Sequence, residues 1–213
     1  GYPRERIDVC GFVVRRYTPS DAAAIVDAVS ASIEHLRPWM PWIAFEPQNV
    51  EQRRALIDEW SNEWETKQSF PFGIFEDDVL VGSTGLHVRS GPGTLEIGYW
   101  VHAEHVGRGI ATLGARAMVE VGFEMPEVVA IEIVHDPSNT ASRRIPEKLA
   151  FVHVGEARNS VGGEFGRGRR SHLPTAQCST HGVVMDEDHL TIGAQPGVRL
   201  QAGRSVGEGG TKG

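Results

Sequence analysis

Cysteine is scarce in this sequence. Cys10 and Cys178 are the two present, and they lie 168 positions apart. Two thiols cannot supply a framework of several disulfides or the closely spaced ligand pairs of a structural zinc site, so we expect a cytoplasmic location. His172, His181 and His189 lie in the same C-terminal part as Cys178 but add no second close pair of ligands. We therefore expect no bound metal.

Long apolar runs and an excess of positive charge are also missing. No stretch approaches the roughly 20 apolar residues that cross a bilayer, and the first ten residues lack the apolar segment of a signal peptide. Lys and Arg number 21 against 28 Asp and Glu, for a formal net charge of -7. That balance argues against a general binder of nucleic-acid phosphates. We expect no membrane or DNA partner, and either a monomer or a homodimer.

Glycine is distributed unevenly along the chain. Residues 1–154 contain 12 glycines, whereas the much shorter stretch 155–213 contains 13 and shows no sustained apolar period. Ordering a glycine costs the most backbone entropy, and few apolar side chains are present there to offset that cost. We expect one folded domain over residues 1–156 and a Gly-rich, poorly ordered segment over residues 157–213, with a short strand at 182–185.

Hydrophobic periodicity divides the first part of the chain into helices and strands. The Asp77-Asp78 pair predicts a tight hairpin between two of the strands. The order of elements mixes antiparallel hairpins with one parallel crossover, which predicts an α/β (or α+β) fold around a mixed sheet. Strands are expected at 12–17, 70–76, 79–88, 95–101, 128–134 and 151–154, and helices at 18–33, 50–66, 107–123 and 138–149.

The most informative stretch lies between the strand that ends at Val101 and the helix that follows it. This loop contains Gly107, Arg108 and Gly109. The first N–H groups of a helix have no internal partners and carry the positive end of the dipole, and glycines let a phosphate approach them. Arg108 can add a charge-assisted contact. The alternative is a glycine turn that only allows tight packing. The loop is neither a Walker loop nor a dinucleotide fingerprint.

Three motifs resemble those of known acyltransferases. The segment Val106-Gly107-Arg108-Gly109-Ile110-Ala111 resembles the Gln/Arg-x-x-Gly-x-Gly/Ala motif of the GNAT superfamily of N-acyltransferases, with Val106 in place of the leading Gln/Arg. Residues 139–151 (NTASRRIPEKLAF) are similar to the superfamily's Asn-x-x-Ser…Glu-Lys-Leu-Gly-Phe signature. Residues 34–42 (EHLRPWMPW) are similar to the Leu-x-Pro-Trp-x-Pro-Trp segment of the Rim-type ribosomal-protein N-terminal acetyltransferases. The resemblance covers roughly residues 10–156.

The resemblance implies a GNAT-like, mostly antiparallel sheet flanked by helices, with a V-shaped splay between the parallel strands 95–101 and 128–134. It implies direct transfer of an acetyl group from acetyl-CoA to a primary amine, which is a protein N-terminal α-amine in the Rim-type branch. There are two alternatives: the acceptor is a small-molecule amine, or the chain is a non-catalytic module that binds CoA. The residues implied to bind CoA are Trp100, Val101, Val106, Gly107, Arg108, Gly109, Ile110, Ala111, Thr112 and Asn139.

The candidates for proton transfer come from two regions. Ser142 occupies the position of the serine associated with protonating the thiolate in Rim-type members, although it can instead be a structural serine of the first helical turn. Pro146 stands where many members have a tyrosine acid, and it cannot donate a proton. Glu96 is the candidate base because it is the acid on the strand that leads into the loop, with His87 and Glu34 as alternatives.

Tryptophans are the candidate walls of the acceptor site. Trp39 and Trp42 lie in a proline-broken loop, where they form either an aromatic wall for the substrate or part of the core. We expect His87 to lie beside the acceptor as well. Trp60 and Trp64 recur at helical spacing and are expected in the core. Asn139 is expected to contact the pantetheine arm, with a plain helix-start role as the alternative.

Overall fold

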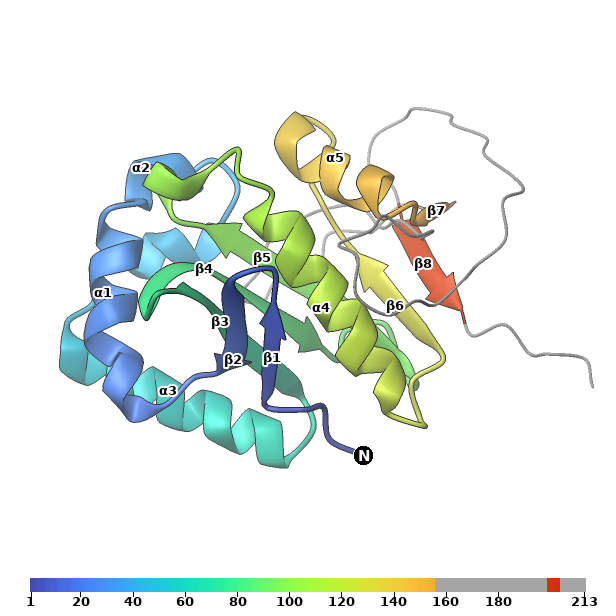
Figure 1. Cartoon of the computed structure of the whole chain (residues 1–213), viewed down its shortest axis with the longest axis horizontal. Helices are drawn as coiled ribbons and strands as arrows, with labels where there is room; N and C mark the ends of the chain where they lie inside the picture. The colour runs from blue at the N-terminus through green and yellow to red at the C-terminus, as the bar shows by residue number, and fades with distance from the viewer. Residues whose placement is uncertain (156–198, 204–213) are drawn as a thin grey trace, which may run out of the picture.

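The computed structural model describes residues 1–155 and 199–203, and within them a single eight-stranded sheet carries the fold (Figure 1). Its spatial order is β1-β2-β3-β4-β5-β6-β8-β7. Only β5 and β6 run parallel, and every other neighbouring pair is antiparallel. The expected fold class, a mixed and mostly antiparallel sheet, is confirmed. The strands are β1 Arg6–Val9, β2 Phe12–Arg16, β3 Ser69–Glu76, β4 Val79–His87, β5 Thr94–Val101, β6 Ala130–Ile133, β7 Val152–Gly155 and β8 Arg199–Gly203.

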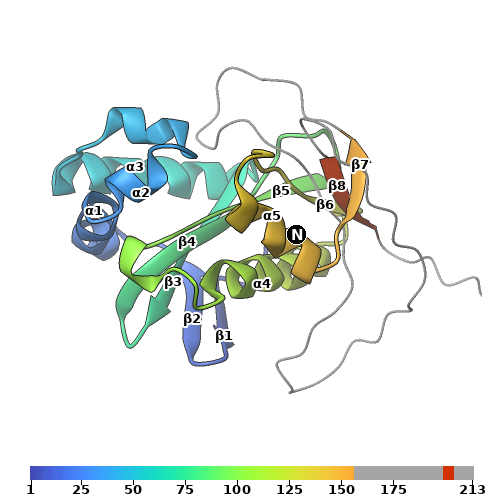
Figure 2. The ribbon, with the colours of Figure 1, turned by 90° about the horizontal axis from the view of Figure 1, so that it is seen from above.

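Helices cover both faces of this sheet. Figure 2 shows α1, α2 and α3 on one face and α4 on the other. Alternate residues of β5 therefore enter different cores: Leu95 and Ile97 pack in the cluster that contains α4, whereas Trp100 packs in the cluster that contains α1. The helices are α1 Ala22–Ser30, α2 Ile33–Leu36, α3 Val50–Glu65, α4 Ile110–Glu124 and α5 Thr140–Lys148, with 3₁₀ turns η1 Pro19–Asp21, η2 Pro41–Phe45 and η3 Ala103–His105.

Two tight hairpins shape the N-terminal half of the sheet. Asp77 and Asp78 both have positive φ (46° and 65°), as expected for the tight turn between β3 and β4. Cys10 and Gly11 (φ 49° and 82°) turn β1 back on β2 in the same way. The sequence analysis missed β1, because a four-residue strand with two charged residues shows too little periodicity to be recognised.

The helix expected over residues 18–33 is interrupted. Helix α1 ends at Ser30, and α2 begins at Ile33 after a break. At the break, the Ser32 hydroxyl donates to the Ala28 carbonyl (2.7 Å), and its oxygen accepts the Ala103 amide (3.0 Å). A serine side chain that bonds the backbone competes with helix continuation, and here it also ties the helices to the loop after β5.

Strand β8 inserts between β6 and β7, antiparallel to both. The strand predicted at 182–185 lies outside the described residues and stays a prediction; His172, Cys178, His181 and His189 lie outside them as well. The division into a domain over 1–156 and a poorly ordered segment over 157–213 remains a prediction. In the described part of the chain, no helix has the length and apolarity to cross a membrane, and no group of three or more His, Cys, Asp or Glu side chains is arranged to hold a metal ion.

Candidate active site

The glycine loop between β5 and α4 presents unused backbone donors. Gly107 (φ 78°) and Gly109 (φ 77°) both adopt left-handed conformations, and Gly109 is the N-cap of α4. The backbone N–H groups of residues 107–112 donate to no other residue that the structure describes. Apart from the adjacent residues and the helix backbone, no atom of the described part of the chain lies within 4 Å of where a Cβ on either glycine would be. An anion can therefore reach the positive end of α4, so the loop fits a diphosphate.

The Arg108 side chain has other partners. Its guanidinium binds both carboxylate oxygens of Glu76, at the end of β3 (2.6 and 2.8 Å), and lies 2.9 Å from Nδ1 of His105. This contact holds the pKa of Glu76 below its usual value. Val106, at the position of the missing Gln/Arg, is 47% exposed. The backbone N–H groups, rather than these side chains, are therefore the donors that remain available for an anion.

Strands β5 and β6 separate at the point where β5 approaches the glycine loop. Their pairing runs from Thr94–Ala130 to Ile97–Ile133, where β6 ends. Strand β5 continues to Val101 and pairs there with β4 only. The half of β5 that contains Trp100 and Val101 therefore has an open edge on its β6 side, among the residues described. This is the splay that the resemblance implied.

A hydroxyl pair stands beside this opening. The phenol of Tyr99, on β5, lies 3.0 Å from Oγ of Ser142, in the first turn of α5. Burial raises the pKa of Tyr99, while the contact with Ser142 acts in the opposite direction. Asn139 caps α5: its Oδ1 accepts a hydrogen bond from the backbone N–H of Ser142 (3.0 Å). The cap does not use the side-chain NH₂ of Asn139. The sequence analysis identified Asn139 and Ser142 but missed Tyr99, which resembled an ordinary aromatic strand residue.

Pro146 explains part of this arrangement. It lies inside α5, four residues after Ser142, and has no N–H to donate to the Ser142 carbonyl. The Tyr99 hydroxyl lies 3.3 Å from that carbonyl oxygen and takes the place of the missing helical donor. The phenol of Tyr99 on β5 thus provides the hydrogen bond that Pro146 cannot.

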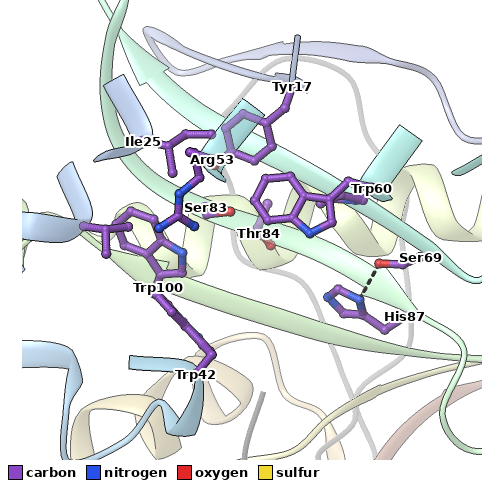
Figure 3. Close-up of a pocket in the computed structure, with 12 residues that line it drawn as sticks. Tyr17, Ile25, Trp42, Arg53, Trp60, Ser69, Ser83, Thr84, His87 and Trp100 are labelled. Atoms are coloured by element: carbon purple, nitrogen blue, oxygen red, sulfur yellow. Dashed lines mark hydrogen bonds between the residues drawn. The ribbon is translucent and has the colours of Figure 1, made fainter. Parts of the chain in front are cut away.

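A pocket opens on the opposite face of the sheet from α4, between α1, η2, α3 and strands β3 to β5 (Figure 3). It brings together Trp42 and His87, which were predicted to lie at the acceptor site, and Trp100, which was predicted to bind CoA. Trp39 is not among the lining residues. Trp60 lines the pocket, whereas Trp64 is buried in the core as expected. The lining residues are Tyr17, Ile25, Val29, Trp42, Arg53, Trp60, Ser69, Pro71, Ser83, Thr84, His87 and Trp100.

The two candidate bases lie opposite each other on neighbouring strands. His87 on β4 is the register partner of Glu96 on β5. Nδ1 of His87 lies 2.7 Å from the Ser69 hydroxyl, and burial, with a smaller effect of Arg89, lowers the pKa of His87 to about 3. Glu96 is buried and accepts a hydrogen bond from Arg89 (2.9 Å). His87 is therefore neutral near pH 7. The third candidate, Glu34, pairs with Arg37 on the surface.

A buried ion pair supports one wall of the pocket. Arg53 on α3 is 3% exposed, and its guanidinium binds the carboxylate of Glu46, whose side chain is also 3% exposed. In Figure 3 the guanidinium points toward the centre of the pocket, near Ser83 and Trp100. The sequence analysis missed Arg53, because on a highly charged helix nothing distinguishes a buried arginine from its exposed neighbour Arg54.

Comparison with known proteins places the chain in a family. Residues 12–152 match the acetyltransferase (GNAT) domain family. The "Putative ribosomal N-acetyltransferase YdaF" of Bacillus subtilis (strain 168) is 27% identical over 150 residues, which cover 70% of this chain and 81% of that protein. The "Probable N-acetyltransferase YjcK" of the same strain is 35% identical over 116 residues, 53% of this chain and 64% of that protein.

A solved structure with the same fold is a ribosomal L7/L12 α-N-protein acetyltransferase in complex with coenzyme A. It superposes with a TM-score of 0.67 at 18% identity, over 76% of this chain and 93% of that one. The expected likeness to ribosomal-protein acetyltransferases is confirmed by the first of these relatives in sequence, and the solved structure shows the same fold. The chain belongs to the GNAT acetyltransferase family, whose members are acyl-CoA-dependent N-acyltransferases.

Proposed function

We propose that this chain transfers an acetyl group from acetyl-CoA to a primary amine, and that the acceptor is the N-terminal α-amine of a protein. The observation that carries the proposal is the set of unused amides of residues 107–112 at the end of the open edge of β5. Likeness to a protein named as a ribosomal N-acetyltransferase supports the choice of acceptor.

Bound acetyl-CoA would supply the acetyl group as a thioester. The amides of Gly107 to Thr112 would hold its diphosphate, and the open edge of β5 around Trp100 and Val101 would orient the pantetheine arm and polarise the thioester carbonyl. The side-chain NH₂ of Asn139 would contact the same arm. The lining of the pocket would keep water from the amine, which attacks the thioester directly without a covalent enzyme intermediate.

The two proton transfers would use residues on different elements: an acid on α5 and a base on β5. Ser142 would donate a proton to the departing sulfur, with Tyr99 next to it in the same hydrogen-bonded pair. Glu96 would take the proton of the amine. His87 is the weaker candidate because its pKa of about 3 favours the neutral ring but gives it little affinity for a proton.

Two measurements test this function. The first follows thiol release from acetyl-CoA with N-terminal peptides, polyamines and aminoglycosides as acceptors. The second measures CoA binding by calorimetry. Release with an N-terminal peptide is the expected result. Release only with small-molecule amines contradicts the proposed acceptor. CoA binding without release on any acceptor contradicts the proposed reaction and identifies a non-catalytic CoA-binding module.

A further inference from the structure

The pocket between α3, η2 and the sheet contains hydrogen-bond donors that lack acceptors. Nε of Arg53 is buried and bonds to no residue that the structure describes, since the pairing with Glu46 uses Nη2. The indole Nε1 of Trp42 is buried in the same way. The two residues come from different elements, α3 and η2, and both line the pocket.

Leaving these donors unsatisfied is costly. A buried donor without an acceptor loses its hydrogen bonds to water and gains none in return, and the cost is larger for a charged group. Nη2 of Arg53 is occupied by Glu46, which fixes the plane of the guanidinium and the direction of its remaining N–H groups. A ligand oxygen in the pocket would satisfy donors that the protein already holds in position.

The charge of the lining residues limits which ligand fits. Arg53 is the one lysine or arginine among them, and none of them is a carboxylate, since its partner Glu46 is not part of the lining. A polyamine or an aminoglycoside would bring additional ammonium groups into a pocket without an acid to receive them. An uncharged or anionic oxygen would instead meet a cation and an indole N–H.

We propose that Arg53 and Trp42 recognise an oxygen of the acceptor, namely the carbonyl of the residue that carries the α-amine. This inference rests on the proposed function, because it specifies how the same pocket selects its substrate. Arg53 and Trp42 are thus specificity-determining residues that select peptide-like acceptors over simple alkylamines.

The test compares two ligands on the unaltered protein. One is a short N-terminal peptide, and the other is its alkene isostere, in which a carbon–carbon double bond replaces the first peptide group and removes its carbonyl oxygen together with its N–H. Binding of each to the CoA-loaded protein is measured by calorimetry. We expect the isostere to bind at least tenfold more weakly. Equal affinities, or no binding of the peptide, would overturn the proposal.

Variants assign the effect to the two residues. Trp42→Phe keeps the aromatic contact with Trp100 and removes only the N–H, and Arg53→Lys keeps the charge but not the planar array of donors. Each variant is expected to reduce the ratio of peptide affinity to isostere affinity several-fold and to leave CoA affinity unchanged. Arg54→Gln, on the exposed side of the same helix, is the matched control and should leave the ratio unchanged. An unchanged ratio in both pocket variants overturns the assignment.

Turnover and thiol release, measured with the same two ligands and acetyl-CoA, separate the inference from the function on which it rests. Turnover of the peptide and the isostere with equal kcat/KM would uphold acetyl transfer and overturn oxygen recognition. Selective binding of the peptide without thiol release would uphold recognition and contradict the acetyl transfer.

Discussion

The phenol of Tyr99 lies 3.0 Å from the hydroxyl of Ser142 and 3.3 Å from its carbonyl oxygen. Pro146, one helical turn later, cannot donate to that carbonyl, so a strand residue provides the hydrogen bond that the helix itself lacks. The contact joins β5 to α5 at the splay between β5 and β6. Stability and catalysis are therefore both expected to depend on it.

Removing the Tyr99 hydroxyl should cost less stability when the helix regains its own donor. In the Pro146→Ala background, the new N–H can reach the Ser142 carbonyl. Tyr99→Phe alone is expected to lower the free energy of unfolding by about 1 kcal/mol, and by clearly less in that background. Urea unfolding of the four proteins checks this. Additive effects would show that the Tyr99 hydroxyl does not replace the helical donor.

The two hydroxyls should act as a unit in catalysis. Ser142→Ala is expected to lower kcat about a hundredfold with little effect on CoA affinity, because a proton donor contributes to the transition state rather than to ground-state binding. Tyr99→Phe should lower kcat less, and the double variant should be no slower than Ser142→Ala. Steady-state kinetics and calorimetry make the comparison. Unchanged kcat in Ser142→Ala would rule out its role as the acid.

A side chain at Gly109 should weaken CoA binding, although the protein itself leaves room for one. Gly109→Val forces a branched side chain to adopt positive φ and places it among the helix amides, so CoA affinity is expected to fall at least tenfold. Gly91→Val is the control, because that turn glycine also has positive φ (102°) and open space around it. We expect both variants to lose similar amounts of stability, and only Gly109→Val to lose CoA affinity. Equal CoA affinities would contradict the phosphate-binding assignment.

Stability should decrease in mild acid because of His87. Burial lowers the pKa of this residue to about 3 in the folded state, against about 6.5 when unfolded. Between these values the unfolded chain binds a proton that the folded chain does not. The free energy of unfolding therefore falls as the pH decreases from about 6.5 toward 3, by at most about 1.4 kcal/mol per pH unit. His87→Asn retains an acceptor for Ser69 and removes this titration.

Chemical unfolding of the wild type and His87→Asn over this pH range makes the comparison. The variant keeps the neighbouring charges of Arg89 and Glu96, so their contributions cancel between the two profiles. A flatter profile for the variant is expected. Parallel profiles would show that His87 does not titrate between the folded and unfolded states.

The buried pair should be sensitive to the loss of one partner. Glu46→Gln leaves the Arg53 charge uncompensated in the interior and is expected to cost about 3–5 kcal/mol. The double variant Glu46→Gln/Arg53→Met should recover much of that loss. Glu34→Gln removes an exposed pair with Arg37 and should leave the free energy of unfolding unchanged within error. Denaturant unfolding distinguishes these cases. If Glu46→Gln loses no more unfolding free energy than Glu34→Gln, the Glu46–Arg53 pair is exposed to water in solution.

Local patterns were enough to predict most of the fold. The alternation around Asp77-Asp78 and the apolar spacing of residues 50–66 gave β3, β4 and α3 nearly to the residue, because short-range sterics and burial determine these elements. The break at Ser32 was not predicted from the local pattern, and one of the two hydrogen bonds of the Ser32 hydroxyl there is to the amide of Ala103, which is remote in the chain.

The candidate site also has features that local sequence predicts and features that depend on tertiary contacts. The sequence by itself determined the glycine loop, since positive φ and free helix amides are properties of a short segment. Only the tertiary structure decided that Arg108 pairs with Glu76, that Tyr99 contacts Ser142, and that Arg53 is buried beside the pocket between α3, η2 and the sheet. These contacts join residues distant in sequence, and their energies depend on burial and distance, which the chain acquires only when the sheet brings its elements together.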